Sequence, residues 1–168
     1  RSGVRVRVLT NSLAATDEPV VHTGYRRYRP EMLAMGMQLY ELSPQRVSRS
    51  LRLGRFSTSI GRLHAKSAVI DRERVFIGSM NFDPRSRDLN TEFALLIRSP
   101  ELAEELLALI ERLAREGAYR LHLDADGRTL RWSTGDGDAM IGANEPDTDW
   151  GSRLLLDLLE PLVPEEML

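Results

Sequence analysis

The chain has 168 residues, 42% of them hydrophobic, which is enough to form one domain with a buried core. It contains no cysteine and three histidines, which excludes disulfides and thiolate metal sites and argues against a zinc cluster. No apolar run approaches the roughly 18–20 residues of a membrane span, and no signal peptide is visible. Because the sequence begins Arg-Ser-Gly directly before a predicted strand, we expect a fragment or processed piece of a longer protein.

The formal net charge of −2 conceals an asymmetry between the two parts of the chain. Residues 1–98 contain 17 Lys and Arg against 9 Asp and Glu, a net charge of +8, whereas residues 99–168 contain 6 against 16, a net charge of −10. The basic part suits an anionic substrate or surface. Solvated charge on two faces of one domain explains the same numbers equally well.

The first 42 residues predict a βαβ unit. Residues 4–9 alternate apolar and basic side chains with the period of a strand, residues 24–35 have helical spacing, and residues 37–42 form a second short strand. This order predicts two parallel strands. His22, just before the helix, is expected to have a structural or capping role rather than to line a site.

A basic segment follows. Residues 43–62 contain five arginines, six serines or threonines and no acidic residue. They predict a flexible loop that meets phosphate headgroups or an anionic membrane, where each basic residue contributes on the order of 1 kcal/mol; a solvated linker is the alternative. Only Phe56 interrupts the arginines, too little for a base-stacking platform, which argues against nucleic acid as a partner.

Residues 63–82 predict a β-hairpin around a charged four-residue loop, residues 71–74. In that register, four polar side chains cluster at the open end of one sheet face: His64, Lys66, Ser79 and Asn81. Lys66 then faces Ser79, and His64 faces Asn81. A shift of one residue would move these side chains to opposite faces.

The cluster has the composition of a phosphate site. An imidazole can attack phosphorus or carry protons, while an ammonium and an amide stabilise charge on phosphate oxygens. Lys66 is the only lysine beside 22 arginines, and a compact ammonium is not interchangeable with a guanidinium. The alternative, an ordinary buried hairpin, is weak because two polar residues point into an otherwise apolar strand.

The remaining elements follow in order. Residues 92–98 are nearly all apolar, which predicts a central strand covered on both faces, with Glu92 at its edge needing a partner such as His64. Residues 99–117 predict a capped helix whose leucine stripe belongs to the core. Residues 119–133 predict a second hairpin that contains a structural His122. Residues 150–162 predict a short helix whose apolar side packs on this domain, on a missing half or on lipid.

The motif residues carry a family resemblance. His64, Lys66 and Asp71, followed by the run GSMN at 78–81 and by Glu92, resemble the HKD signature of the phospholipase D superfamily. The run NFDPRSRDLNTEF and the ending WGSRLLLDLLEPLVPEEML are similar to bacterial cardiolipin synthases and their close relatives.

The resemblance implies phosphodiester-bond transfer through a phosphohistidine, by a phosphatidyltransferase or a phospholipase D, without a metal or other cofactor. It implies two groups of site residues: catalytic His64, Lys66, Asp71 and Glu92, and phosphate- or substrate-binding Lys66, Ser79, Asn81, Asp83, Arg85 and Ser86. Glu92 would orient the imidazole as a carboxylate does in a catalytic triad. Asp71 falls at the strand end and is expected to brace the hairpin more than to touch substrate.

The resemblance also implies an α/β fold with a mixed, largely central β-sheet flanked by helices, as one phospholipase D-like domain over residues 1–168. The family builds one site from two HKD motifs, and this chain has one, since neither His22 nor His122 is followed by the required lysine and aspartate. The second motif would come from another half of the same protein or from a homodimer partner, and this piece alone is expected to be inactive or very weak.

The implied substrate is an anionic phospholipid resembling phosphatidylglycerol, met at a membrane surface by a bacterial protein that is cytoplasmic or peripherally bound to the inner membrane. Two alternatives remain open. One is a nuclease-like phosphodiesterase with a single HKD motif that acts as a homodimer. The other is a non-catalytic domain that completes a partner's site.

Overall fold

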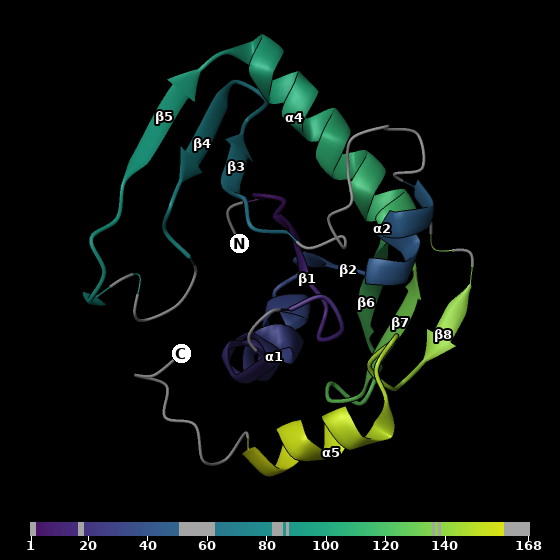
Figure 1. The fold of residues 1–168 in the computed structure, drawn as a ribbon. Helices are drawn as coiled ribbons and strands as arrows, with labels where there is room; N and C mark the ends of the chain where they lie inside the picture. The colour runs from purple at the N-terminus through teal and green to yellow at the C-terminus, as the bar shows by residue number, and fades with distance from the viewer. Residues whose placement is uncertain are drawn as a thin grey trace.

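The computed structural model of the protein describes residues 3–16, 19–50, 63–81, 86, 88–135, 137 and 139–159. Its strands are β1 Arg7–Asn11, β2 Gln38–Leu42, β3 Lys66–Ile70, β4 Arg74–Gly78, β5 Ala94–Arg98, β6 Ala118–Leu123, β7 Leu130–Thr134 and β8 Met140–Gly142. Its helices are α1 Pro19–Ala34, α2 Pro44–Ser50, α4 Pro100–Arg112 and α5 Trp150–Leu159, with a π-helical turn, η2 Leu113–Gly117, after α4 (Figure 1).

The fold is α/β, as predicted, and its strands form two sheets. One sheet has the order β1-β2-β6-β7-β8, and the other has the order β3-β4-β5. Helix α4 runs from the three-stranded sheet to the neighbourhood of β6, so that it connects the two sheets (Figure 1). The described candidate site residues lie in or beside the strands of the smaller sheet.

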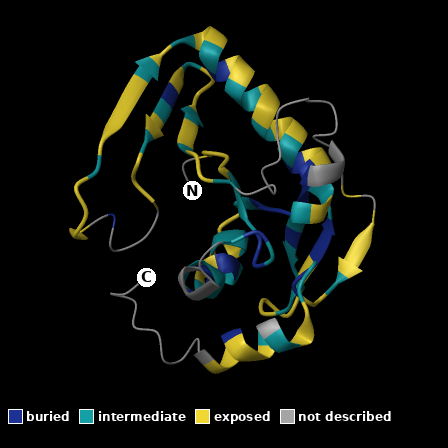
Figure 2. Ribbon diagram, in the orientation of Figure 1, coloured by how far each residue is buried: buried dark blue, intermediate teal, exposed yellow. Residues whose placement is uncertain are grey.

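The larger sheet contains the core. β1 and β2 are parallel and are joined by α1, which confirms the predicted βαβ unit. The buried apolar side chains form two clusters, one around Tyr40 and Leu42 and the other around Leu39 and Trp132. Figure 2 shows the contrast between the mostly buried strands β2 and β6 of this sheet and the largely exposed β5; in β4, Val75 is fully buried.

The helices begin and end partly where expected. α1 starts at Pro19, earlier than the predicted residue 24, and contains Pro30 in its interior. Part of the basic segment is not a loop, because residues 44–50 form α2; residues 51–62 lie outside the described residues. Ser99 caps α4, since its hydroxyl accepts a hydrogen bond from the Leu102 amide at 3.2 Å.

The predicted hairpin exists, but its register was predicted wrongly by one residue. Ile70 pairs with Arg74 and Lys66 pairs with Gly78, so the loop has three residues rather than four. Asp71 and Arg72 have φ angles of 54° and 55°, the left-handed conformation of a tight hairpin turn. Lys66 therefore does not face Ser79, and the predicted pairing of His64 with Asn81 is lost with it.

Strand β5 was predicted to be covered on both faces, and this is wrong. It pairs with β4 alone and forms an edge of the three-stranded sheet. Leu95 and Leu96, which point to opposite faces, are 51% and 63% exposed. The apolar pattern was read correctly as a strand, but the described part of this chain supplies nothing that covers it.

Two smaller differences concern the second half of the chain. The leucine stripe of α4 is only half-buried, and the buried residue of that helix is Ala103. The predicted loop after β7 contains the short strand β8. The predicted second hairpin, β6 and β7, is confirmed as an antiparallel pair.

Within the described residues, no helix has the length and apolar character needed to cross a membrane.

Candidate functional site

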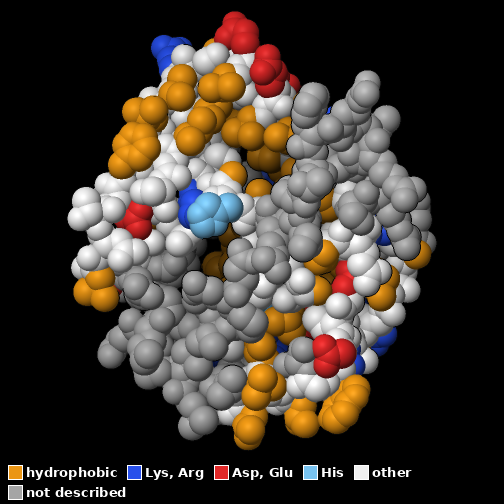
Figure 3. All heavy atoms as spheres, viewed as in Figure 1, with side chains coloured by type: hydrophobic (Ala, Val, Ile, Leu, Met, Phe, Trp, Pro, Cys, Tyr) orange, Lys and Arg blue, Asp and Glu red, His pale blue; other side chains and the backbone are white. Residues whose placement is uncertain are grey.

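His64 and Lys66 form the first part of the site, at the start of β3. The ammonium nitrogen of Lys66 lies 3.3 Å from His64 Nε2 and donates a hydrogen bond to the His64 carbonyl oxygen at 3.0 Å. His64 is exposed and Lys66 is half-buried, so both can reach a ligand. On the face drawn in Figure 3, a histidine and a basic side chain lie together at the surface.

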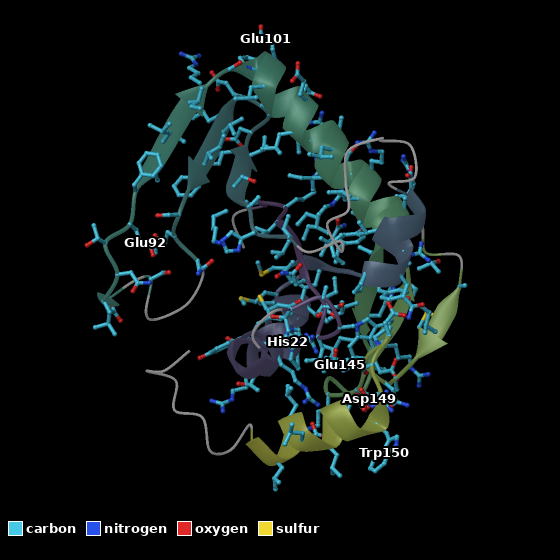
Figure 4. The ribbon with its side chains drawn as sticks, in the orientation of Figure 1. His22, Glu92, Glu101, Glu145, Asp149 and Trp150 are labelled. Carbon is cyan, nitrogen blue, oxygen red and sulfur yellow. The ribbon has the colours of Figure 1, made fainter. Side chains whose placement is uncertain are left out.

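The second part of the site joins the end of β4 to the start of β5. The Ser79 hydroxyl donates a short hydrogen bond to the Glu92 carboxylate and accepts one from the Phe93 amide at 3.1 Å. The buried hydroxyl of Ser86 accepts a hydrogen bond from the Asn81 amide at 3.2 Å. Figure 4 shows Glu92 at the end of the sheet opposite Glu101, which lies in the first turn of α4.

The two parts are connected electrostatically through Glu92. Hydrogen bonds from Ser79, then from Ser86 and Asn90, lower the pKa of the Glu92 carboxyl, and the positive charge of Lys66 lowers it further. Glu92 is therefore held as a carboxylate near Lys66. Within the described part of the chain, the hydrogen bonds to this carboxylate come from Ser79, Ser86 and Asn90, and none is formed with His64.

Gly78 allows β4 and β5 to approach each other at the site. A side chain at this position would place its Cβ 2.7 Å from the Phe93 carbonyl oxygen, a backbone atom that cannot turn aside. The same carbonyl accepts a hydrogen bond from the Ser79 amide at 2.9 Å. The glycine before Ser79 thus permits the close approach through which Ser79 meets Glu92.

Asp71 lies apart from the other site residues. It is in the hairpin turn, exposed, and seven residues from His64 along an extended strand, which corresponds to roughly 20 Å at ~3.3 Å per residue. Its neighbours tie the turn down: Arg72 pairs with Glu104 at 3.0 Å, and Glu73 pairs with Arg98. These contacts belong to Arg72 and Glu73, so the bracing role of Asp71 itself stays a prediction. Asp83 and Arg85 lie outside the described residues.

The other two histidines have structural contacts. His22 is buried, and its Nε2 lies 2.7 Å from an Arg29 guanidinium nitrogen; Figure 4 shows it on α1, away from Glu92. His122 Nε2 lies 2.8 Å from the Ser133 hydroxyl on the neighbouring strand. Among the described residues, no three His, Cys, Asp or Glu side chains are grouped so that they could hold a metal ion.

Sequence reasoning missed Asn11, at the end of β1. Its carboxamide makes two hydrogen bonds with the backbone of Leu63, the residue before His64. No periodicity or motif marks this asparagine, because the partners are 52 positions apart in the sequence and meet only in the folded chain.

Comparison with known proteins shows which family the chain belongs to. A family model described as cardiolipin synthase, PLD-like domain, matches residues 1–114, and the chain belongs to this family. Both parts of the site described above, His64 with Lys66 and Ser79 with Glu92, lie within the matched residues.

Several bacterial proteins are similar to this chain in sequence. The chain is 42% identical to cardiolipin synthase C of Escherichia coli, with 100% of this chain and 36% of that protein covered. It is 34% identical to an uncharacterized protein of Helicobacter pylori, with 98% of this chain and 32% of the relative covered. A cardiolipin synthase of a Geobacillus species is 31% identical over 64% of this chain and 18% of its own length. The chain thus spans about a third of the first two relatives, and no solved structure matches it.

Proposed function

We propose that the protein transfers a phosphatidyl group through a phosphohistidine, acting on an anionic phospholipid that resembles phosphatidylglycerol. The observation that carries this proposal is the exposed pair of His64 and Lys66, whose reactive nitrogens lie 3.3 Å apart. The similarity to proteins named cardiolipin synthase supports the lipid substrate.

The chemistry needs two histidines. In one assignment, His64 Nε2 attacks phosphorus, so that a P–N bond forms while the P–O bond to the departing alcohol breaks, and the second histidine gives that alcohol its proton. The hydroxyl of an acceptor lipid or of water then attacks, gives its proton to the second histidine, and displaces His64. In the other assignment the two histidines exchange these roles.

The remaining side chains stabilise charge. Lys66 and Asn81 hold the non-bridging phosphate oxygens, where negative charge builds up in the transition state. Ser79 keeps Glu92 ionised beside them. Ser86 fixes the Asn81 backbone. Asp83 and Arg85, which lie outside the described residues, stay predicted phosphate-binding residues.

The second HKD motif comes from another half of the same protein or from a second copy of this chain. The exposure of His64 and of the neighbouring sheet edge supports a partner that covers the site. We infer that the assembled protein works at a membrane surface, in the cytoplasm or peripherally attached to the inner membrane. The basic residues of the first 98 positions favour such an anionic surface.

The experiment combines the mass of the native particle with turnover of phosphatidylglycerol by wild type, His64→Ala and the matched control His122→Ala. We expect turnover in a particle that contains two HKD motifs, its loss in His64→Ala, and its retention in His122→Ala, because His122 belongs to the larger sheet, where it is hydrogen-bonded to Ser133. A dimer with this behaviour shows that two copies complete the site, whereas a silent monomer directs the same assay to the protein that contains both motifs.

Two results would overturn the proposal. One is undiminished lipid turnover by His64→Ala in a two-motif particle. The other is metal-independent DNA cleavage by a dimer that leaves phospholipid intact, which would support the nuclease-like alternative instead.

A further inference from the structure

Asn11 clamps the backbone directly before His64. Its Nδ2 donates to the Leu63 carbonyl oxygen at 2.9 Å, and its Oδ1 accepts from the Leu63 amide at 2.8 Å. A carboxamide that engages both backbone groups of one residue imitates the two hydrogen bonds of a strand pair. The clamp is the hydrogen-bonded connection between the edge strand β1 and the segment that enters β3.

Both partners of the clamp, Asn11 and Leu63, are attached to the larger sheet. Asn11 pairs in the β1–β2 ladder with Leu42, which is buried, and the neighbouring Ser12 amide donates to the Leu42 carbonyl oxygen at 3.2 Å. The Leu63 side chain packs against the core cluster that contains Leu42. Both the backbone and the side chain of Leu63 are therefore fixed to the larger sheet.

His64 depends on such an anchor because it lies before the ladder pairing of β3. Ladder pairing in β3 begins at Lys66, two residues later, and the imidazole itself is exposed. The peptide group before His64 is held by Asn11 through the Leu63 carbonyl, and the peptide group after it is held by Lys66 through the His64 carbonyl. Together these two contacts fix the direction in which the imidazole leaves the backbone.

We propose that Asn11 is a positioning residue for His64, which sets the imidazole by fixing the Leu63 peptide groups without touching substrate. The catalytic part of this inference rests on the proposed function. A displacement of about 1 Å between reacting groups can cost on the order of 100-fold in rate. The loss should appear in kcat rather than in KM, because Lys66 and Asn81, the expected phosphate ligands, keep their places.

The first test does not depend on activity. The imidazole resonances of the three histidines are recorded by NMR in the isotope-labelled chain for wild type, Asn11→Ala, Asn11→Asp and the matched control Asn144→Ala, an exposed loop residue. Asp keeps the acceptor for the Leu63 amide but faces the Leu63 carbonyl with a second oxygen, so both Asn11 variants should move the His64 resonance. The His22 and His122 resonances should stay in place, as should all three in the control.

The second test measures turnover in the active two-motif protein. Asn11→Ala should lower kcat about 100-fold with KM unchanged, and Asn11→Asp should also lower it, while Asn144→Ala matches wild type. In the NMR test, a His64 resonance that does not move, or equal movement of the resonances of all three histidines, would overturn the positioning role. In the turnover test, a wild-type kcat in both Asn11 variants would overturn it too. If wild type itself shows no turnover, the proposed function fails, and the NMR result still decides whether Asn11 positions His64.

Discussion

The hydroxyl of Ser79 controls the charge state of the carboxylate at the site. Its hydrogen bond is the largest cause of the lowered pKa of Glu92, ahead of Ser86, Asn90 and the charge of Lys66. Since Glu92 is at the surface, local hydrogen bonds rather than burial set its ionisation. The site therefore holds a carboxylate near Lys66 even in mildly acidic solution.

We expect Ser79→Ala to raise the pKa of Glu92 toward its ordinary value, because the strongest donor to the carboxylate is removed. In wild type, the stabilisation from ionised Glu92 is present above its unfolded-state pKa and is lost as pH falls through the lower folded-state pKa. In the variant, the folded-state pKa lies closer to the unfolded-state value, so this stabilisation is smaller and its loss is complete at a higher pH. A carboxyl titration by NMR measures the shift, with Ser67→Ala on β3 as the control; an unchanged Glu92 titration in Ser79→Ala would contradict the assignment.

At this scale, the residue types of the site could be predicted, but their geometry could not. The spacing of His64 and Lys66 placed them together, and the structure brings Ser79 to Glu92. The register of the hairpin was predicted wrongly because Asp71 and Arg72 adopt left-handed φ angles. The turn contains no glycine, the residue that would have indicated this conformation in the sequence. Asn11 was missed because its contact with Leu63 depends on the folded chain.

At the scale of elements, a buried ionic network attaches α1 to the larger sheet. Arg29 on α1 is fully buried and pairs with Glu41 of β2 at 2.7 Å and with Glu145 of the segment before α5 at 2.5 Å. Trp132 of β7 donates to Glu41 at 2.9 Å. Removing one member would leave an unpaired buried charge, a loss of about 3–5 kcal/mol in typical cases.

His22 belongs to this network and makes the stability of α1 depend on pH. Burial, followed by the charges of Arg29 and Arg26, lowers the pKa of His22 from 6.5 to about 3. Below about pH 6.5 the imidazole of His22 is therefore protonated in the unfolded chain, whereas in the folded chain it stays neutral until the pH falls to about 3. Folding stability should fall across this window, by up to roughly 4–5 kcal/mol at its lower end.

The variant His22→Gln removes this titration and keeps an acceptor for Arg29. We expect its free energy of unfolding to decline less than that of wild type between about pH 7 and about pH 4.5. Urea denaturation at several pH values measures the difference, and His122→Gln is the control at a more exposed histidine. Parallel pH profiles for wild type and His22→Gln would show that His22 is protonated in the folded state.

Elements with strong local patterns were predictable, whereas those that depend on packing were not. The period of two in β1, the capped start of α4 at Ser99 and the turn between β6 and β7 were all visible in the sequence. The short strand β8 and the π-helical turn η2 were not, because neither has a periodicity of its own. β8 exists through its pairing with β7.

The whole molecule distributes its apolar surface unevenly. The larger sheet is well buried, whereas β5 and the outer side of α5 expose leucines and, on α5, Trp150 at 74%. The sequence pattern predicts that these segments are apolar. It does not predict that their side chains are exposed to solvent, because exposure depends on which atoms pack against them in the folded protein. Contiguous exposed apolar surface of this kind is typical of interaction sites.

The distribution of charge decides which surface should meet a membrane. Residues 1–98 carry a net charge of +8 and residues 99–168 a net charge of −10, so an anionic bilayer attracts the part with His64 and repels the part with α5. We therefore expect the chain to bind phosphatidylglycerol vesicles, to bind phosphatidylcholine vesicles more weakly, and to dissociate as salt rises above about 0.1 M, where screening acts within ~10 Å.

Tryptophan fluorescence separates this mode of binding from insertion of α5. Trp132 is buried, whereas Trp150 is the exposed first residue of α5 and reports its surroundings. Binding through the basic part should leave the Trp150 emission at its solvent-exposed wavelength, and Trp150→Phe provides the spectrum of Trp132 alone. A blue shift of Trp150 together with salt-resistant binding to both kinds of vesicle would contradict the electrostatic mode, because it would mean that the apolar side of α5 outweighs the acidic charge around it.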